Sequence, residues 1–174
     1  SDLSAKAAVL IDGENGRILF GKNEKEKRAM ASTTKIMTCI VALENCKANQ
    51  VVEISSKATS MPKVKMNVMK GEQYYLKDLL YAMMLESYND VAVAVAESIG
   101  GNIENFAKMM NEKAKKIGAN NTSFVTPNGL DAKEHYSTAY DMAKIGAYAI
   151  KNKSFLEIIN TKKYNLTEIK NKRN

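Results

Sequence analysis

The sequence predicts a single α+β domain in which strands and helices are segregated along the chain. Three observations support this: a strand hairpin opens the chain at 7–21, helical periodicity fills the middle, and 163–169 again has strand character. Strand–helix–strand order is typical of α+β domains. With 174 residues, the chain is long enough to bury a core of its own and favours one domain.

The first predicted element is the hairpin. Residues 7–11 form a continuous apolar run, Ala-Ala-Val-Leu-Ile, which suits a strand covered on both faces. Turn-forming residues follow at 12–16, and a second apolar run begins at Ile18. A charged connection then leads to the helices.

The first predicted helix spans 33–45 and is buried, because its apolar residues leave almost no polar face. These residues are Ile36, Met37, Ile40, Val41 and Leu43. A short strand is predicted at 51–54, and the chain over 55–73 is polar and irregular.

Two further helices flank a short polar break. Apolar residues at i, i+3, i+4, i+7 and i+8 indicate an amphipathic helix that starts at Leu76. The break falls at 86–90. The stretch 91–99 is then apolar nearly all round, which indicates a second buried helix that ends at two glycines.

The last two predicted helices have capping signals. Asn102 is placed to cap a helix over 103–117, and Gly118 to end it. After a loop, Thr138 with an acidic residue three positions later matches a capping box for a helix that runs to about Ile150.

The net charge of +7 comes from 23 Lys and only 3 Arg, and the lysines are scattered along the chain. Recognition of bases and phosphates favours the arginine fork, so we expect a solvated lysine-rich surface and no nucleic-acid partner. An anionic polymer is the alternative partner. No apolar run approaches the roughly 18 residues of a membrane span, and no signal peptide is present. The chain is therefore expected to be soluble, either cytosolic or a mature exported protein.

The cysteines and the histidine do not predict a metal site. Cys39 and Cys46 lie two helical turns apart in sequence, a rise of roughly 10.5 Å, which is too far for a disulfide. We expect both to be small core residues. One His and two Cys cannot alone build a Cys/His zinc site, and we expect no metal and no cofactor.

A serine nucleophile needs a base within hydrogen-bond reach, and the chain offers two kinds. His135 is the one histidine, but no Gly-x-Ser-x-Gly elbow occurs, so a loop histidine is the favoured interpretation. The other base is the lysine of Ser-x-x-Lys, because positions i and i+3 share a helix face. Two such tetrads begin at Ser32 and Ser60, a number that chance alone explains.

Context favours the tetrad of Ser32 and Lys35. Ser32 opens the predicted buried helix, where the helix dipole and free backbone N–H groups stabilise negative charge. Lys35 lies one turn further among apolar residues, and burial there would favour the neutral amine that can act as a base. The Ser60 tetrad lies in polar chain, contains Pro62 and has no apolar helix behind it. The alternative for Ser32 is an ordinary N-cap with Lys35 exposed.

A second candidate group, Ser87-Tyr88-Asn89, falls in the break between two apolar helices. A hydroxyl held there could relay protons between the nucleophile, the lysine and a leaving amine. The Asn89 amide could bind a substrate carbonyl. The alternative is an ordinary helix junction in which Asn89 or Asp90 is the N-cap.

Taken together, residues 31–38 (Ala-Ser-Thr-Thr-Lys-Ile-Met-Thr) and 85–90 (Leu-Glu-Ser-Tyr-Asn-Asp) resemble the first two motifs of the penicillin-recognising serine enzymes. The flanking sequence is more similar still to the low-molecular-weight penicillin-binding proteins, the serine-type D-alanyl-D-alanine carboxypeptidases of peptidase family S11. Four further segments carry this resemblance in order: 8–12, 16–19, 126–131 and 135–141.

The resemblance implies a β-lactamase/transpeptidase-like fold, with an antiparallel sheet flanked by a helical block and the active site between them. It implies that Ser32 is the acylated nucleophile, Lys35 the base that activates it and Ser87 the proton relay. Asn89 would orient the substrate and Lys35. The Ser32 N–H would form half of an oxyanion hole. The implied reaction removes the terminal D-alanine of a peptidoglycan pentapeptide through an acyl-enzyme, which β-lactams trap.

The chain departs from this family in two ways. Tyr88 stands where many relatives have Gly, and the third motif, Lys-Thr-Gly, does not occur in the 174 residues. We therefore expect 1–174 to be one catalytic domain that lacks its C-terminal portion and is weakly active or inactive unless a companion fragment supplies that strand. The resemblance also implies an exported protein of the bacterial cell envelope, with its signal peptide removed and any membrane attachment made only through a missing C-terminal segment.

Two other functions stay open from the sequence. One is a β-lactamase of the same fold, although the class A signature Glu-x-x-Leu-Asn does not occur. The other is a non-catalytic, lysine-rich module that binds anionic polymers or nucleic acid.

Overall fold

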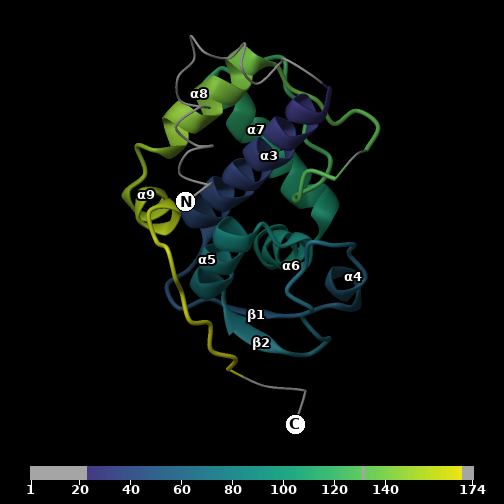
Figure 1. The fold of residues 1–174 in the computed structure, drawn as a ribbon, viewed down its shortest axis with the longest axis vertical. Coiled ribbons are helices and arrows are strands. Elements are labelled where there is room, and N and C mark those ends of the chain that lie inside the picture. Colours follow the sequence, from purple (N-terminus) through teal and green to yellow (C-terminus); the bar gives the residue numbers. More distant parts are fainter. Residues whose placement is uncertain (1–22, 131, 170–174) are drawn as a thin grey trace.

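The computed structural model describes residues 23–130 and 132–169. In this part of the chain a block of helices stands on a small antiparallel sheet (Figure 1). The elements follow in the order α3 (Asn23–Asn45), β1 (Val51–Glu53), α4 (Ser56–Thr59), β2 (Gln73–Tyr75), α5 (Leu76–Glu86), α6 (Asn89–Gly100), α7 (Ile103–Ile117), α8 (Ala139–Ala149) and α9 (Lys153–Ile159). The predicted hairpin at 7–21 lies outside the described residues.

The helix α3 crosses the molecule diagonally in Figure 1 and is longer than predicted. It ends at Asn45, as expected, but begins at Asn23 rather than at residue 33. The added turns are rich in Glu, Lys, Arg, Met and Ala, which are good helix formers. They carry no apolar stripe, so hydrophobic periodicity could not reveal them in the sequence.

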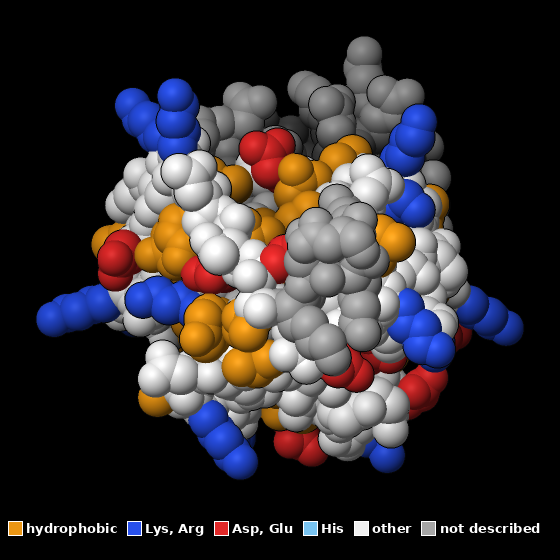
Figure 2. Space-filling view, turned by 90° about the horizontal axis from the view of Figure 1, so that it is seen from below, with side chains coloured by type: hydrophobic (Ala, Val, Ile, Leu, Met, Phe, Trp, Pro, Cys, Tyr) orange, Lys and Arg blue, Asp and Glu red, His pale blue; other side chains and the backbone are white. Residues whose placement is uncertain are grey.

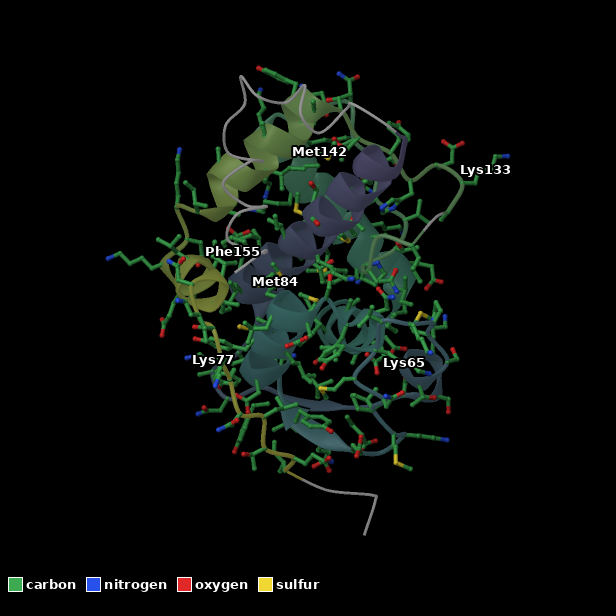
Figure 3. All side chains as sticks on the ribbon, in the orientation of Figure 1. Lys65, Lys77, Met84, Lys133, Met142 and Phe155 are labelled. Carbon is green, nitrogen blue, oxygen red and sulfur yellow. The ribbon has the colours of Figure 1, made fainter. Side chains whose placement is uncertain are left out.

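The core is centred on α6, whose first eight residues, Asn89 to Ala96, are all buried. This helix packs against α3, α4, α5, α7 and β1. Small side chains of Ala and Val alternate along it, and this allows neighbours to approach from every side. The sequence prediction of a helix that is apolar nearly all round is confirmed. Met84 of α5 and Phe155 of α9 are buried in the same core, whereas Lys133 projects from a loop into solvent (Figure 3).

The sheet joins β1 and β2 in antiparallel register, with Val52 opposite Tyr74. Both of these side chains are buried against the helices, while their strand neighbours Val51 and Tyr75 are exposed. The strand predicted at 51–54 is therefore confirmed, one residue shorter. The stretch 55–73 is less irregular than expected, because it contains α4, which Ser55 caps by accepting a hydrogen bond from the Ala58 N–H.

The capping signals of α7 and α8 are confirmed. The Asn102 side chain accepts from the Asn105 N–H, and α7 ends at Gly118, whose φ of 94° favours glycine. The Thr138 side chain accepts from the Asp141 N–H at the start of α8. Each signal is local in the chain, and each was therefore readable from the sequence.

The prediction of a strand at 163–169 is wrong. This segment follows α9, which was not predicted, and runs down past α5 to the sheet (Figure 1). It is held by a ring stack of Tyr164 on Tyr81, with centroids 4.0 Å apart, and by one backbone hydrogen bond from the Ile169 N–H to the Gln73 oxygen at 2.8 Å. A side-chain stack and a single backbone bond therefore take the place of the strand ladder that its composition suggested.

The two cysteines have different environments, and both are free. Cys39 is buried in α3 as expected, and burial, with a smaller effect of Cys46, raises the pKa of its thiol well above the ordinary range. Cys46 is exposed, so the expectation that it is a core residue is wrong. The reason is that α3 ends at Asn45 and the chain there turns into solvent.

Within the described residues, none of the helices is both long enough and apolar enough to cross a membrane.

Candidate active site

The side chain of Lys35 lies where α3 meets the junction of α5 and α6. It is 6% exposed. Its Nζ donates to the Ser87 carbonyl oxygen at 2.7 Å, to Ser87 Oγ at 3.1 Å and to Asn89 Oδ1 at 3.0 Å. An ammonium group has three N–H donors and no acceptor, so the number of donors equals the number of these oxygen acceptors. The structure thus brings together three of the four predicted site residues from segments more than fifty positions apart.

Ser87 ends α5 in the left-handed conformation, with φ 63° and ψ 36°. Few residues other than glycine adopt this conformation. Its N–H still donates to the Met83 oxygen at 2.7 Å, while its carbonyl and its hydroxyl both face Lys35. The backbone turn therefore gives one residue two contacts with the same ammonium.

Asn89 begins α6 and is 5% exposed. Its Nδ2 donates to the Lys63 and Pro62 carbonyl oxygens at 3.0 and 3.3 Å. Carbonyl oxygens can only accept and the Lys35 ammonium can only donate. The neighbours therefore fix the amide with its nitrogen toward the loop and its oxygen toward the lysine.

Ser32 is half-buried on α3, three positions before Lys35 and hence on the same helix face. Its predicted position at the free N-terminus of a helix is wrong, because α3 begins at Asn23. Inside a helix, backbone N–H groups bond to the carbonyls four residues earlier. The expected help from the helix dipole, and the expected oxyanion donor at the Ser32 N–H, therefore do not follow from this structure.

A neighbouring side of α3 is held by the loop before α8. The Val125 N–H donates to His135 Nδ1 at 2.9 Å, and His135 Nε2 lies 3.0 Å from Thr34 Oγ1. Because Nδ1 accepts, Nε2 carries the proton and donates to Thr34. Thr34 in turn donates to the Met30 oxygen at 2.8 Å. The ring therefore contacts α3 through Thr34, and its nitrogens are engaged as supports.

Two more contacts join this loop to α3. Thr38 Oγ1 donates to the Pro127 oxygen at 2.7 Å. Gly129 has a φ of +79°, and a Cβ added there would lie 2.6 Å from the Cα of Ala31, the residue before Ser32. Sequence reasoning missed these supports, although threonines at 34 and 38 inside a buried helix were a signal that polar partners were needed.

The rival tetrad lies on the surface. Ser60 is the exposed C-cap of α4, and its hydroxyl donates to the Lys57 oxygen at 2.8 Å. Lys63 is exposed and enters the site only through its backbone carbonyl. Tyr88 packs partly against the core. Burial, with smaller effects of Glu86 and Asp90, raises the pKa of its hydroxyl.

The arrangement can hold and move a proton. Burial disfavours the charged form of Lys35, whereas three oxygen acceptors favour it. The Ser87 hydroxyl lies 3.1 Å from this nitrogen and can both accept and donate a hydrogen bond. In the described part of the chain, no cluster of three or more His, Cys, Asp or Glu side chains could hold a metal ion.

Comparison with known proteins identifies the family of the chain. The family model described as D-alanyl-D-alanine carboxypeptidase, Peptidase S11, matches residues 1–174. The chain is 41% identical over 162 residues to the D-alanyl-D-alanine carboxypeptidase DacF of Bacillus subtilis, covering 90% of this chain and 42% of that protein. It is 37% identical to DacC of Escherichia coli, over 83% of this chain and 39% of that protein. The chain thus spans about two-fifths of the length of these relatives.

Solved structures share the fold. The D-alanyl-D-alanine carboxypeptidase DacD from Francisella tularensis superposes with a TM-score of 0.67 at 41% identity, over 72% of this chain and 31% of that one. The S96A mutant of the Streptomyces K15 DD-transpeptidase gives a TM-score of 0.71 at 29% identity, over 79% and 57%. These neighbours confirm the predicted fold class of mixed helices and antiparallel sheet. The chain belongs to the D-alanyl-D-alanine carboxypeptidase family, Peptidase S11.

Proposed function

We propose that the protein containing this chain is a serine D-alanyl-D-alanine carboxypeptidase that removes the terminal D-alanine of peptidoglycan pentapeptides. The observation that carries the proposal is the buried Lys35 nitrogen, held by Ser87 and Asn89 one helical turn from Ser32. Family membership supports the same reaction class, because the curated relatives are D-alanyl-D-alanine carboxypeptidases.

In the proposed first step, Ser32 Oγ attacks the carbonyl carbon between the two D-alanines, and its proton passes to neutral Lys35, directly or through Ser87. The three oxygens around Nζ stabilise the ammonium that results. The C–N bond then breaks, Ser87 passes its proton to the leaving amine and takes one from the Lys35 ammonium, which returns to the neutral amine, and the peptide remains as an ester on Ser32. Water hydrolyses that ester in the second step and restores the serine.

Asn89 has two roles in the proposal. Its Oδ1 holds Lys35 in place, and the second proposed role, which the family resemblance implies, is to orient the substrate. We leave the Ser32 N–H out of the oxyanion hole, because α3 continues through Ser32. The donors to the oxyanion therefore have to come from elsewhere in the full protein.

The proposed partners are peptidoglycan peptide stems, with β-lactams as inhibitors that acylate Ser32. The proposed location is extracytoplasmic, in the bacterial cell envelope. The lysines on the face shown in Figure 2 project at separated positions around the rim. Separated lysines suit a solvated surface near anionic cell-wall polymers and not a track for a nucleic-acid backbone.

The test is mass spectrometry of the natural protein that contains this sequence after treatment with penicillin. We expect a covalent adduct on the peptide that carries Ser32, and none in Ser32→Ala. Ser60→Ala is the matched control and keeps the adduct, because Ser60 lies on the surface. An adduct on Ser60, or no adduct, overturns the proposal. Rapid release of the adduct indicates a β-lactamase, and salt-sensitive polymer binding without labelling indicates a binding module.

A further inference from the structure

We propose that Asp90 is a positioning residue of this site. It holds the loop 62–68 against the start of α6, and the loop in turn fixes the Asn89 amide with its oxygen toward Lys35. The inference rests on the proposed function and adds to it a residue that touches none of the reacting groups.

Asp90 lies in the first turn of α6 and is fully buried. Its Oδ1 accepts from the Met66 and Val91 N–H groups, each at 2.9 Å, and its Oδ2 accepts from the Val68 N–H at 3.1 Å. Two of these donors belong to the loop and one to the helix. A buried carboxylate with several N–H donors is well satisfied, so this side chain ties the loop to α6.

The other end of the loop is tied to Asn89. The carbonyl oxygens of residues 62 and 63 accept from the Asn89 side chain, and the Val64 oxygen accepts from the Asn89 N–H at 2.7 Å. The loop thus presents carbonyls to Asn89 and N–H groups to Asp90. Asn89 and Asp90 are adjacent in α6 and bind the loop through opposite kinds of group, because Asn89 donates hydrogen bonds to it and Asp90 accepts hydrogen bonds from it.

The polarity of the Asn89 amide depends on those carbonyls. An asparagine amide keeps its shape when its oxygen and nitrogen exchange places, so only its partners decide which atom faces Lys35. If the loop moves away, the amide nitrogen loses its acceptors and can turn toward the ammonium, where two donors oppose each other. Asp90 prevents this from a distance, by keeping the loop in place.

Asp141 offers a matched control. It is also a buried aspartate in the first turn of a helix, α8, and it accepts from the Asn121 N–H and from Thr122 Oγ1, both at 2.7 Å. Its partners lie in the segment before α8, and none of them contacts Lys35, Ser87 or Asn89. Asp141→Asn therefore has the structural cost of losing a buried carboxylate without the proposed effect on the site.

The experiment compares Asp90→Asn with Asp141→Asn in the natural protein. We expect Asp90→Asn to lower the rate constant of acylation by a labelled penicillin at least tenfold, the effect of about one charge-assisted hydrogen bond. Asp141→Asn lowers the melting temperature but leaves that rate constant within twofold. In an Asn89→Ala background, Asp90→Asn causes no further loss, because both changes act on one interaction.

A second measurement is independent of activity. Hydrogen exchange by NMR is expected to speed up at the Asn89 side-chain amide and at the Met66 and Val68 N–H groups in Asp90→Asn, and not in Asp141→Asn. If Asp90→Asn does not fold, Asp90→Ser keeps an oxygen acceptor and gives the same comparison. Equal effects of the two asparagine variants on acylation, additive losses with Asn89→Ala, or unchanged exchange overturn the inference. If penicillin does not acylate the wild-type protein, the proposed function fails and the exchange measurement alone decides.

Discussion

Two sides of α3 are held by contacts of different kinds. On one side, the junction of α5 and α6 surrounds the charged Lys35 nitrogen with three oxygens. On the other side, the loop before α8 contacts Thr34 and Thr38 through neutral hydrogen bonds. Thr34 and Lys35 are neighbours in sequence, yet they face different partners. One helix therefore separates proton chemistry from mechanical support within a single turn.

The largest expected effect is at the charged side. Lys35→Met removes the proposed base, and the acylation rate is expected to fall about 10²- to 10⁴-fold, the range for general acid–base groups. Stopped-flow labelling with a fluorescent penicillin measures it. Lys113→Met is the control, because Lys113 pairs with Glu44 at 2.8 Å on the surface, and its loss is expected to leave the rate unchanged. An acylation rate of Lys35→Met within tenfold of the wild-type rate contradicts the role of Lys35 as the base.

The supporting side is tested next by Gly129→Ala. The new Cβ meets the Ala31 backbone at 2.6 Å and φ is +79°, so strain and overpacking together are expected to cost about 3 kcal/mol or more. Gly101→Ala has a similar φ of +84° but open space around it, so it is expected to cost about 1 kcal/mol. Chemical denaturation measures both variants. Equal losses of unfolding free energy in the two variants would show that the loop is not closely packed against α3 at Gly129.

A smaller effect is expected at Thr34. Thr34→Val leaves the His135 Nε2–H without its acceptor on α3, at an expected cost of about 1–2 kcal/mol. Thr34→Ser keeps the hydroxyl and is expected to lose less. The lone histidine makes the NMR readout simple: the ring is expected to carry its proton on Nε2 in the wild type. A proton on Nδ1 instead would contradict the proposed direction of this hydrogen bond.

The smallest expected effect lies away from both sides of α3, at the segment after α9. The hydrogen bond to Asp78, followed by burial, raises the pKa of Tyr164 from 10.0 to about 12. This contribution to stability is fully present below pH 10 and is lost as the pH rises toward 12, because the unfolded state ionises first. Spectrophotometric titration of Tyr164→Phe against the wild type identifies the late-ionising phenol. In Asp78→Asn the same phenol is expected to ionise nearer pH 10, and no change there would contradict the stated cause.

Sequence reasoning worked best where the deciding contact is local. The caps at Asn102 and Thr138 bond within three residues, and both helices begin where predicted. It failed at the start of α3, where the added turns have helix-forming residues but no apolar stripe. It also failed at 163–169, where a tyrosine stack and not strand pairing holds the chain.

The site could be predicted only in part for the same reason. The spacing of Ser32 and Lys35 is local, but Ser87 and Asn89 reach Lys35 across more than fifty residues, and only the family resemblance connected them. Asp90 was visible only as a candidate N-cap, a position that Tyr88 occupies, and its bonds to the loop carried no signal, because backbone groups of any sequence can make them. The threonines of α3 were visible as polar residues in a buried helix, without indicating their partners.

The distance along the chain between Lys35 and Ser87 also bears on how the protein folds. Contacts between residues 52 positions apart form only after a long segment has been closed, and closure of that kind slows folding relative to local helix formation. Helical circular dichroism should then recover before the pocket around the ammonium does. A fluorescent β-lactam added during refolding would report when the active site forms. It would label chains in which the site is complete and leave unlabelled the chains that have regained only their helices.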